Sequence, residues 1–257
     1  VVRVAEQQGI PIITAYGRND AVPNAHPLYV GPLGRAGAPE AAAACRRADV
    51  LLVVESDVPW FPHLKEPRAE AKVIQVAVDP LFSRYPIRGF PADVALAGTP
   101  RLTLGALAEA TTRLIDARTV AERRKLWATE HSRLREAWAA KARAVQSDRP
   151  IDMAWVSRCL GEVMDDRTIV VNEYDLDPTQ ACFRIPGSFL PTSPAGGLGW
   201  GLGAALGAKL AAPDKTVIAL TGDEDGPVRR AWRTQGPAAA SAALEKLTAI
   251  FAPSRAS

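Results

Sequence analysis

Short runs of valine, isoleucine and leucine, separated by helical segments, constrain the fold of this chain more than any other feature. The apolar runs and the helical patterns alternate through the first half of the chain, the runs at 10–14, 50–55, 73–79 and 94–97 and the helices at 1–8, 39–48 and 100–117. Strands that are apolar on both faces are typical of a parallel sheet covered by helices on both sides. The alternation predicts an α/β fold, with a doubly wound parallel-sheet unit at residues 1–118.

A long charged helix is predicted at 119–145, within a connecting segment that we place at 119–150. Leu126, Trp127, Leu134 and Trp138 recur at helical spacing and predict one packed stripe on an otherwise solvated helix. A second α/β unit is expected at 151–226, with helices at 153–164 and up to 212 and strands at 168–172 and 216–221. We expect this second sheet to be incomplete, because the tail at 227–257 is rich in Ala, Arg and Pro and has no strand pattern.

Composition and charge exclude several classes of protein. No apolar run reaches the roughly 18 residues that a membrane span requires, and 31 Lys and Arg against 28 Asp and Glu give no basic face for nucleic acid. Three cysteines without paired spacing predict buried apolar side chains and, with the absence of a signal-peptide pattern, a cytoplasmic protein. The three histidines have no metal-ligand spacing, and we expect them on the surface or in loops.

The beginning of the chain resembles the interior of a longer protein. It opens with Val1 inside an amphipathic run, and the first methionine is Met153. We therefore expect the chain to be a piece of something larger.

Two segments carry the residues that suggest chemistry. The first is SPAGGLGWGLGAALGAKLA at 193–211, where glycines let the backbone at a helix start approach a ligand or another helix closely. The second is TVIALTGDEDG at 216–226, where a strand ends in Gly222 and Asp223. A carboxylate at a strand end can hold a divalent metal beside a phosphate, or it can cap a turn. The glycines can equally serve close packing alone.

A dinucleotide site is the other reading of the glycine segment. Gly199, Gly201 and Ala204 fit G-x-G-x-x-A, but that fingerprint must follow directly on a strand, and here PTSPAG precedes it. A nucleotide-dependent oxidoreductase would also need a glycine turn after a strand of the first unit, and VLLVVESDVPWF has none. This alternative is the weaker one.

Taken together, the two segments resemble the cofactor-binding domain of thiamine-diphosphate-dependent enzymes of the acetolactate synthase and benzoylformate decarboxylase type. In that family a G-G-[hydrophobic]-G helix start precedes a strand ending in G-D-G. VVNEYDLDPTQACFRIPGSF at 170–189 resembles the first strand of the same domain, and IPIITAYGR and HPLYVGPLG resemble the family's central domain. The resemblance covers about 1–225.

The resemblance implies a set of cofactor-binding residues, each at the position that matches the family motif. Gly196 would meet the aminopyrimidine, followed by Gly197; Leu198 would support the bent cofactor; Gly222 would lie near phosphate; and Asp223 would bind magnesium. Asn172 and Glu173 would face the diphosphate. Glu173 is unusual beside another negative charge, and a solvated loop side chain is the alternative for it.

The implied reaction is decarboxylation of a 2-oxo acid or carboligation, with thiamine diphosphate and Mg as cofactors. A small 2-oxo acid is then the substrate, neither nucleic acid nor a membrane is a partner, and a homo-oligomer is allowed because the family places the cofactor between subunits. FAD occurs in some central domains of the family, but we do not predict it here.

Three departures from the family pattern predict an inactive chain. First, the pyrimidine-activating glutamate belongs to an N-terminal domain of the family, and we expect no such domain before Val1. Second, Glu224 replaces the last glycine of G-D-G. Third, no asparagine follows Asn172 to supply a second metal ligand. A frameshifted or misannotated reading frame after Asp223 would explain the abrupt change, and it is our hypothesis. The alternative to an enzyme is a non-catalytic remnant or interaction module. No catalytic residue is assigned.

Overall fold

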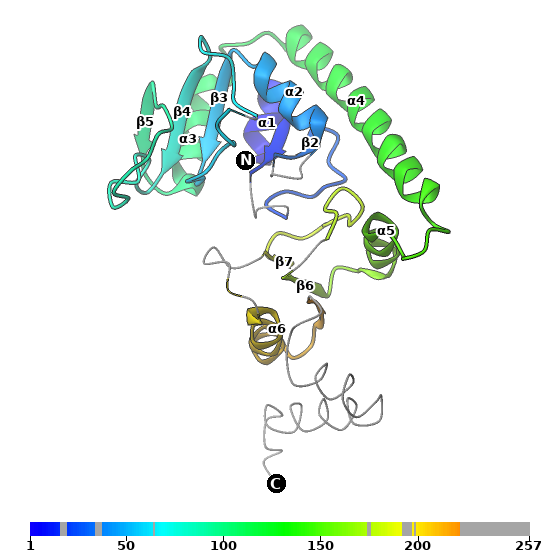
Figure 1. Cartoon of the computed structure of the whole chain (residues 1–257). Helices are drawn as coiled ribbons and strands as arrows, with labels where there is room; N and C mark the ends of the chain where they lie inside the picture. Colours follow the sequence, from blue (N-terminus) through cyan, green and yellow to red (C-terminus); the bar gives the residue numbers. More distant parts are fainter. Residues whose placement is uncertain are drawn as a thin grey trace, which may run out of the picture.

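The computed structural model describes residues 1–15, 20–33, 38–63, 65–173, 176–191, 197 and 199–221. The described part is an α/β structure whose strands pair in parallel throughout, as the apolar runs predict. Figure 1 shows the helices and sheets of the N-terminal half beside the long helix α4, and a second, smaller sheet below them. The α/β class predicted from the sequence is therefore confirmed.

Helices cover both faces of the first three-stranded sheet, which has the order β3-β4-β5. Its strands are β3 (Val50–Val54), β4 (Lys72–Ala77) and β5 (Val94–Ala97). Leu52 and Val54 pack against α1 (Val2–Gln8) and α3 (Pro100–Thr111), while Val53 joins the core formed with α2 (Pro39–Arg47). Alternate residues of β3 thus reach opposite apolar layers, which is why the strand is apolar throughout.

A separate pair of strands lies next to this sheet. β1 (Ile12–Thr14) pairs in parallel with β2 (Tyr29–Pro32). The apolar pattern predicts β1 but not β2. β2 is buried, but it contains Gly31 and Pro32 in place of an apolar run, so its sequence has no strand pattern. Gly31 has φ 121, and a Cβ there would lie 3.0 Å from the Cβ of Ala38, so the close approach to α2 requires glycine.

The long helix α4 (Ala117–Ala144) begins at Asp116, whose side chain accepts a hydrogen bond from the Thr119 amide. It packs through a stripe that differs from the predicted one. Leu134 and Trp138 are buried as expected, but Leu126 is 63% exposed, and the stripe continues instead through His131 and Ala142. The prediction that Leu126 belongs to the packed stripe is wrong. Leu126 stands one position before Trp127, and because Trp127 packs on the core, Leu126 points away from that face.

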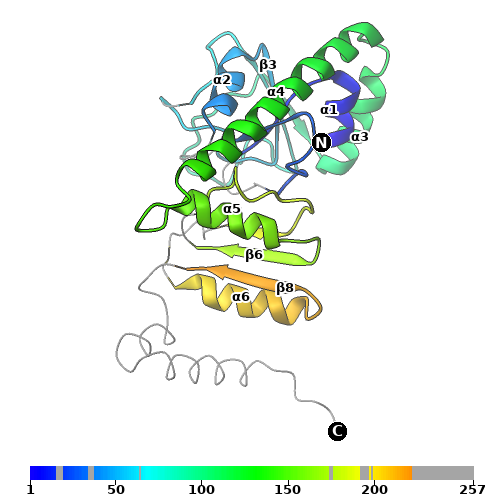
Figure 2. The ribbon, with the colours of Figure 1, turned by 90° about the vertical axis from the view of Figure 1, so that its right-hand side faces the viewer.

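The second three-stranded sheet has the order β7-β6-β8. It consists of β6 (Thr168–Asn172), the very short β7 (Phe189–Leu190) and β8 (Thr216–Leu220). Figure 2 shows β6 and β8 side by side, with α5 (Met153–Val163) and α6 (Trp200–Ala211) above and below them. β6 is the central strand and is almost entirely buried, which matches its unbroken TIVV run.

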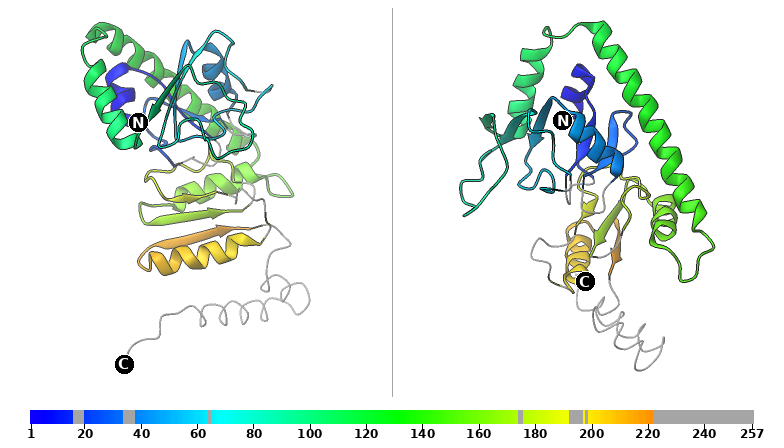
Figure 3. Two further views of the ribbon diagram at one scale, coloured as in Figure 1. Left: turned by 90° about the vertical axis from the view of Figure 1, so that its left-hand side faces the viewer. Right: turned by 45° about the horizontal axis from the view of Figure 1, so that its top comes forward.

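Backbone hydrogen bonds join the first part of the chain to the segment before β7. The Asn24 amide donates to the carbonyl of Phe183 at 2.7 Å, and the Phe183 amide donates to Asn24 Oδ1 at 3.0 Å. The Phe189 amide donates to Asp20 Oδ2 at 3.0 Å. Figure 3 shows, from two further directions, the N-terminal elements next to the segment that leads to β7. The start of the chain therefore helps to hold β7 in place.

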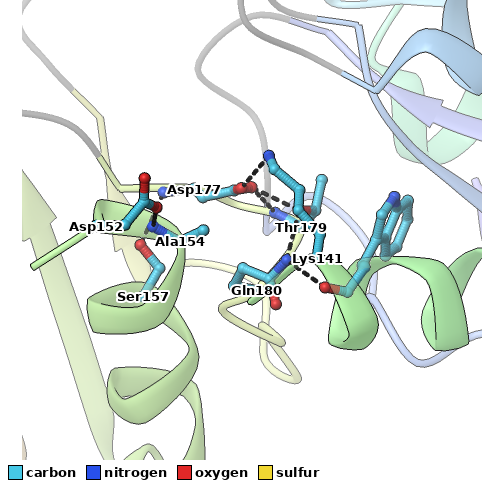
Figure 4. A network of polar contacts seen from close by, with 8 residues as sticks. Lys141, Asp152, Ala154, Ser157, Asp177, Thr179 and Gln180 are labelled. Atoms are coloured by element: carbon cyan, nitrogen blue, oxygen red, sulfur yellow. Dashed lines mark hydrogen bonds and ion pairs between the residues drawn. The ribbon is translucent and has the colours of Figure 1, made fainter. Parts of the chain in front are cut away.

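A polar network fixes the loop that leaves β6 against α4 and α5 (Figure 4). Asp177 pairs with Lys141 at 3.1 Å, and its amide donates to Ser157 Oγ at 2.9 Å. Gln180 Nε2 donates to the carbonyl of Trp138 at 2.8 Å. Asp152 accepts from the Ala154 amide and caps α5. These contacts hold the segment 176–180 against α4 and α5.

Gly161 allows α5 to touch the loop at 180–182. A Cβ at Gly161 would lie 2.7 Å from the Gln180 carbonyl oxygen and 3.2 Å from the Ala181 Cα, both backbone atoms that cannot rotate away. We expect Gly161→Ala to lower the free energy of unfolding by about 1–3 kcal/mol through overpacking. Gly105→Ala is the matched control, since Gly105 also lies within a helix but has no atom near its Cβ position. Urea titration of both variants measures the difference; equal stability would contradict the contact.

His131 is buried on α4, so the expectation that it lies on the surface or in a loop is wrong. Its Nδ1–H donates to the carbonyl of Tyr29 at 2.8 Å. Burial lowers the pKa of His131 below its ordinary value of 6.5. The unfolded chain therefore binds more protons than the folded chain as the pH falls through this range, and protonation favours unfolding.

This burial predicts that stability is lost on acidification. The melting temperature should fall between about pH 7.5 and about pH 5.5, the window in which an unfolded histidine gains its proton. His131→Gln removes this titrating group and should reduce the dependence. The Val1 amino group, whose pKa burial lowers from its ordinary value of 8.0, also gains its proton near this window and accounts for the slope that remains. Thermal unfolding followed by circular dichroism measures both slopes. A variant that keeps the wild-type slope would assign the dependence to another group.

The cysteines differ from the expectation of three buried thiols. Cys45 is buried, and burial raises its pKa to about 11, but Cys159 is exposed and Cys182 is partly exposed. Among the helices that the structure describes, none is both long enough and apolar enough to cross a membrane.

Candidate functional site

The candidate site lies at the carboxyl edge of the β7-β6-β8 sheet. Because all pairings in this sheet are parallel, Asn172, Leu190 and Leu220 end their strands at the same edge. α6 begins at this edge, with Gly199 as its N-cap residue in the left-handed conformation (φ 85). Ligands of open α/β sheets bind at such an edge, where strand ends and helix starts meet.

Glu173 joins the end of β6 to the start of α6. It follows β6 directly, is only 2% exposed, and donates its backbone amide to the Leu220 carbonyl at 2.9 Å. Its carboxylate accepts hydrogen bonds from the amides of Gly199 and Gly201, the latter at 2.8 Å. The first amides of a helix have no partner within the helix and carry partial positive charge, so a carboxylate stabilises them.

The start of α6 and the end of β8 lie side by side. A Cβ at Gly201 would fall 2.5 Å from Glu173 Oε2 and 3.4 Å from Thr221 Cγ2, so only glycine allows this approach. Thr221 comes immediately before Gly222 in the sequence, and Gly201 comes shortly after the Gly196–Gly197 pair. The described residues thus bring together Gly201 and Thr221, one from each of the two segments at 193–211 and 216–226.

The other predicted site residues are placed only in part. Asn172 Oδ1 accepts from the Leu176 amide at 3.2 Å, and a Cβ at Gly197 would meet no atom of the described residues within 4 Å. Gly196, Leu198, Gly222 and Asp223 lie outside the described residues, and with Asp223 goes the predicted metal ligand. Within the described ranges, no three His, Cys, Asp or Glu side chains cluster to hold a metal.

Glu173 has two interpretations from the sequence, a solvated loop side chain and a contact with the diphosphate. The solvated loop side chain is wrong, because the carboxylate is buried against α6. The contact of Glu173 with a diphosphate stays a prediction. Nothing in the local sequence shows that Glu173 turns towards α6, since its partners come more than twenty residues later in the chain.

Trp200 is a residue that the sequence analysis misses. It is the first residue of α6, and its indole Nε1 is buried without a hydrogen-bond partner among the described residues. A buried donor without a partner costs about 1–3 kcal/mol, so such a group in a glycine-rich helix start suits a ligand oxygen. The indole N–H of Trp200 could donate to an oxygen of a bound thiamine diphosphate, and Gly197 presents no side chain to it, whereas the carboxylate of Glu173 already accepts from the amides of α6.

Comparison with known families finds two matches that follow one another along the chain. Residues 1–107 match the family model described as the central domain of thiamine pyrophosphate enzymes. Residues 178–226 match the C-terminal domain of these enzymes, which binds thiamine pyrophosphate. The second match includes both the start of α6 and the end of β8.

Individual relatives cover most of this chain. A sulfoacetaldehyde acetyltransferase of Rhodobacter capsulatus is 31% identical over 251 residues, which is 86% of this chain and 41% of the relative. A sulfoacetaldehyde acetyltransferase of Alcaligenes xylosoxydans xylosoxydans is 30% identical over 86% of this chain and 41% of its own length. A probable acetolactate synthase large subunit of Methanocaldococcus jannaschii is 27% identical over 87% of this chain and 38% of its own length. The chain thus spans about two fifths of the length of these curated relatives.

Proposed function

Because the chain belongs to the family of thiamine pyrophosphate enzymes, we propose that its site is built for thiamine diphosphate and Mg²⁺ and for a small 2-oxo acid. In this proposal 1–118 is the central domain, 119–150 the connecting helix and 151–226 the cofactor-binding part, with 227–257 an atypical tail. When bound, thiamine diphosphate supplies an electron sink for breaking the bond next to the carbonyl of a 2-oxo acid.

The observation that carries the proposal is the meeting of the glycine-rich start of α6 with the end of β8. A Cβ at Gly201 would lie within 3.4 Å of both Glu173 and Thr221, and the Gly196–Gly197 and Gly222–Asp223 pairs stand close to Gly201 and Thr221 in the sequence. Asp223 would bind magnesium, which prefers carboxylate and phosphate oxygens. Gly197 and Trp200 would meet the cofactor, through open space beside the backbone and through the indole N–H.

We also propose that the 257-residue chain by itself binds the cofactor weakly and has no turnover. Glu224 stands where the family motif has its last glycine and adds a negative charge next to Asp223, in the region assigned to the diphosphate. Like charges close together disfavour each other. No asparagine follows Asn172, so the second metal ligand of the family pattern is missing from this sequence.

Titration calorimetry with thiamine diphosphate and Mg²⁺ tests both parts of the proposal. We expect Glu224→Gly to bind the cofactor more tightly than the wild-type chain, because it removes charge and bulk. Asp223→Ala in the Glu224→Gly background should abolish the gain, and Asp214→Ala, on the turn before β8, is the control that should leave it intact. Tight binding by the wild-type chain would refute the weak-binding proposal. Equal binding by Glu224→Gly and by its Asp223→Ala double variant would refute the assignment of the site.

A further inference from the structure

The buried carboxylate of Glu173 connects three segments. Through its backbone Glu173 is tied to the end of β8, with its amide donating to the Leu220 carbonyl at 2.9 Å. Through its side chain it binds the amides of Gly199 and Gly201, which lie on either side of Trp200. One residue therefore couples the end of β6, the end of β8 and the first turn of α6.

The turn that Glu173 holds directly follows, in the sequence, the residues of the predicted cofactor contacts. Gly199 is left-handed and ends the G-G-L-G motif, so its amide belongs to the peptide that follows Leu198. A carboxylate that binds this amide and the Gly201 amide fixes the first turn of α6 from Gly199 onward. It also neutralises the positive end of the helix, because both oxygens accept from its first amides.

We propose that Glu173 is a positioning residue, which holds the glycine-rich turn in its cofactor-binding shape and does not contact the diphosphate itself. This inference rests on the proposed function. Two observations support it: the carboxylate already accepts hydrogen bonds from the amides of Gly199 and Gly201, and it lies so close to Gly201 that a Cβ there would clash with it. In addition, a diphosphate would be repelled by this carboxylate.

A first measurement tests the positioning role without any cofactor. Hydrogen exchange followed by mass spectrometry should show faster exchange of the peptide that contains Gly199 and Gly201 in Glu173→Ala than in wild type, while peptides of the β3-β4-β5 sheet are unchanged. Glu173→Gln retains an acceptor oxygen and should partly restore protection. Unchanged exchange in Glu173→Ala would overturn the inference.

A second measurement links the turn to the cofactor. In the Glu224→Gly background, Glu173→Ala should weaken thiamine diphosphate binding by about tenfold or more, as loss of a supporting partner behind a ligand does, and Glu173→Gln should recover part of it. Gly201→Ala, which displaces the carboxylate, should act like Glu173→Ala, whereas Gly203→Ala, with open space at its Cβ position, should not. Gly201→Ala keeps the test valid if Glu173→Ala does not fold.

The outcomes separate this inference from the proposed function. Tighter cofactor binding by Glu173→Ala would mean that the carboxylate only repels the diphosphate, which overturns the inference. Faster exchange with unchanged affinity would make Glu173 a purely structural residue, which also overturns it. If no variant binds thiamine diphosphate, the proposed function fails, and the exchange experiment still decides whether Glu173 holds the turn.

Discussion

Phe183→Ala is expected to lower the free energy of unfolding by about 3–5 kcal/mol, the usual cost of removing a buried phenylalanine ring. Phe183 is fully buried and packs against Phe189 with ring centroids 4.8 Å apart, in the core that also contains Val170 of β6. Its backbone is bound in both directions by Asn24. The variant should therefore loosen both the second sheet and its contact with the start of the chain.

Chemical denaturation of Phe183→Ala, with Ile185→Ala as the control, measures this effect. Ile185 lies in the same segment but is 37% exposed, so its truncation removes less buried surface and should cost much less. Hydrogen exchange should locate the loss in the peptides of β6, of β7 and of the segment around Asn24. A cost confined to the second sheet would show that the N-terminal contacts contribute little.

Leu134→Ala is expected to cost about 2–5 kcal/mol. Leu134 is 0% exposed and belongs to the same core as α2, β2 and Trp138, so the truncation leaves a cavity beneath α4. Leu126→Ala makes the same chemical change on the same helix at a side chain that is 63% exposed, and it should be nearly neutral. Thermal melts of the two variants compare them directly. A larger loss for Leu126→Ala would restore the predicted stripe and contradict the observed face of α4.

The continuous strands were the most predictable part of the fold. β3, β6 and β8 each contain an uninterrupted apolar run, and the apolar run of β4 is interrupted only by Gln75, so the pattern is visible without coordinates. Helix starts followed ordinary signals, as with Pro39 and Pro100 in the first turns of α2 and α3.

The short and long-range features were not predictable. β2 and β7 lack an apolar run, and they exist because a parallel neighbour supplies their hydrogen bonds. His131 is buried because Tyr29, distant in the sequence, accepts its hydrogen bond. The carboxylate of Glu173 is buried because amides at the start of α6 donate hydrogen bonds to it. In each case the feature depends on a hydrogen-bond partner that is distant in the sequence, so the local sequence does not predict it.

In the candidate site, too, some features could be predicted from the sequence and others could not. The glycine-rich segment and the acidic strand end could be recognised from residue types and spacing, and the family matches include both. The roles of Trp200 and Glu173 could not, because they depend on which atoms remain without partners once α6 has packed against β6 and β8.

The central claim is that the start of α6 and the metal site at Asp223 form one cofactor site. Nuclear magnetic resonance of the indole N–H of Trp200, assigned with Trp200→Phe, tests it with Mn²⁺ in place of Mg²⁺ in the Glu224→Gly protein. We predict that Mn²⁺ with thiamine diphosphate broadens the Trp200 signal and leaves that of Trp127 on α4 sharp, and that Asp223→Ala abolishes the broadening. A Trp200 signal that stays sharp while the cofactor and the metal are bound would contradict the account.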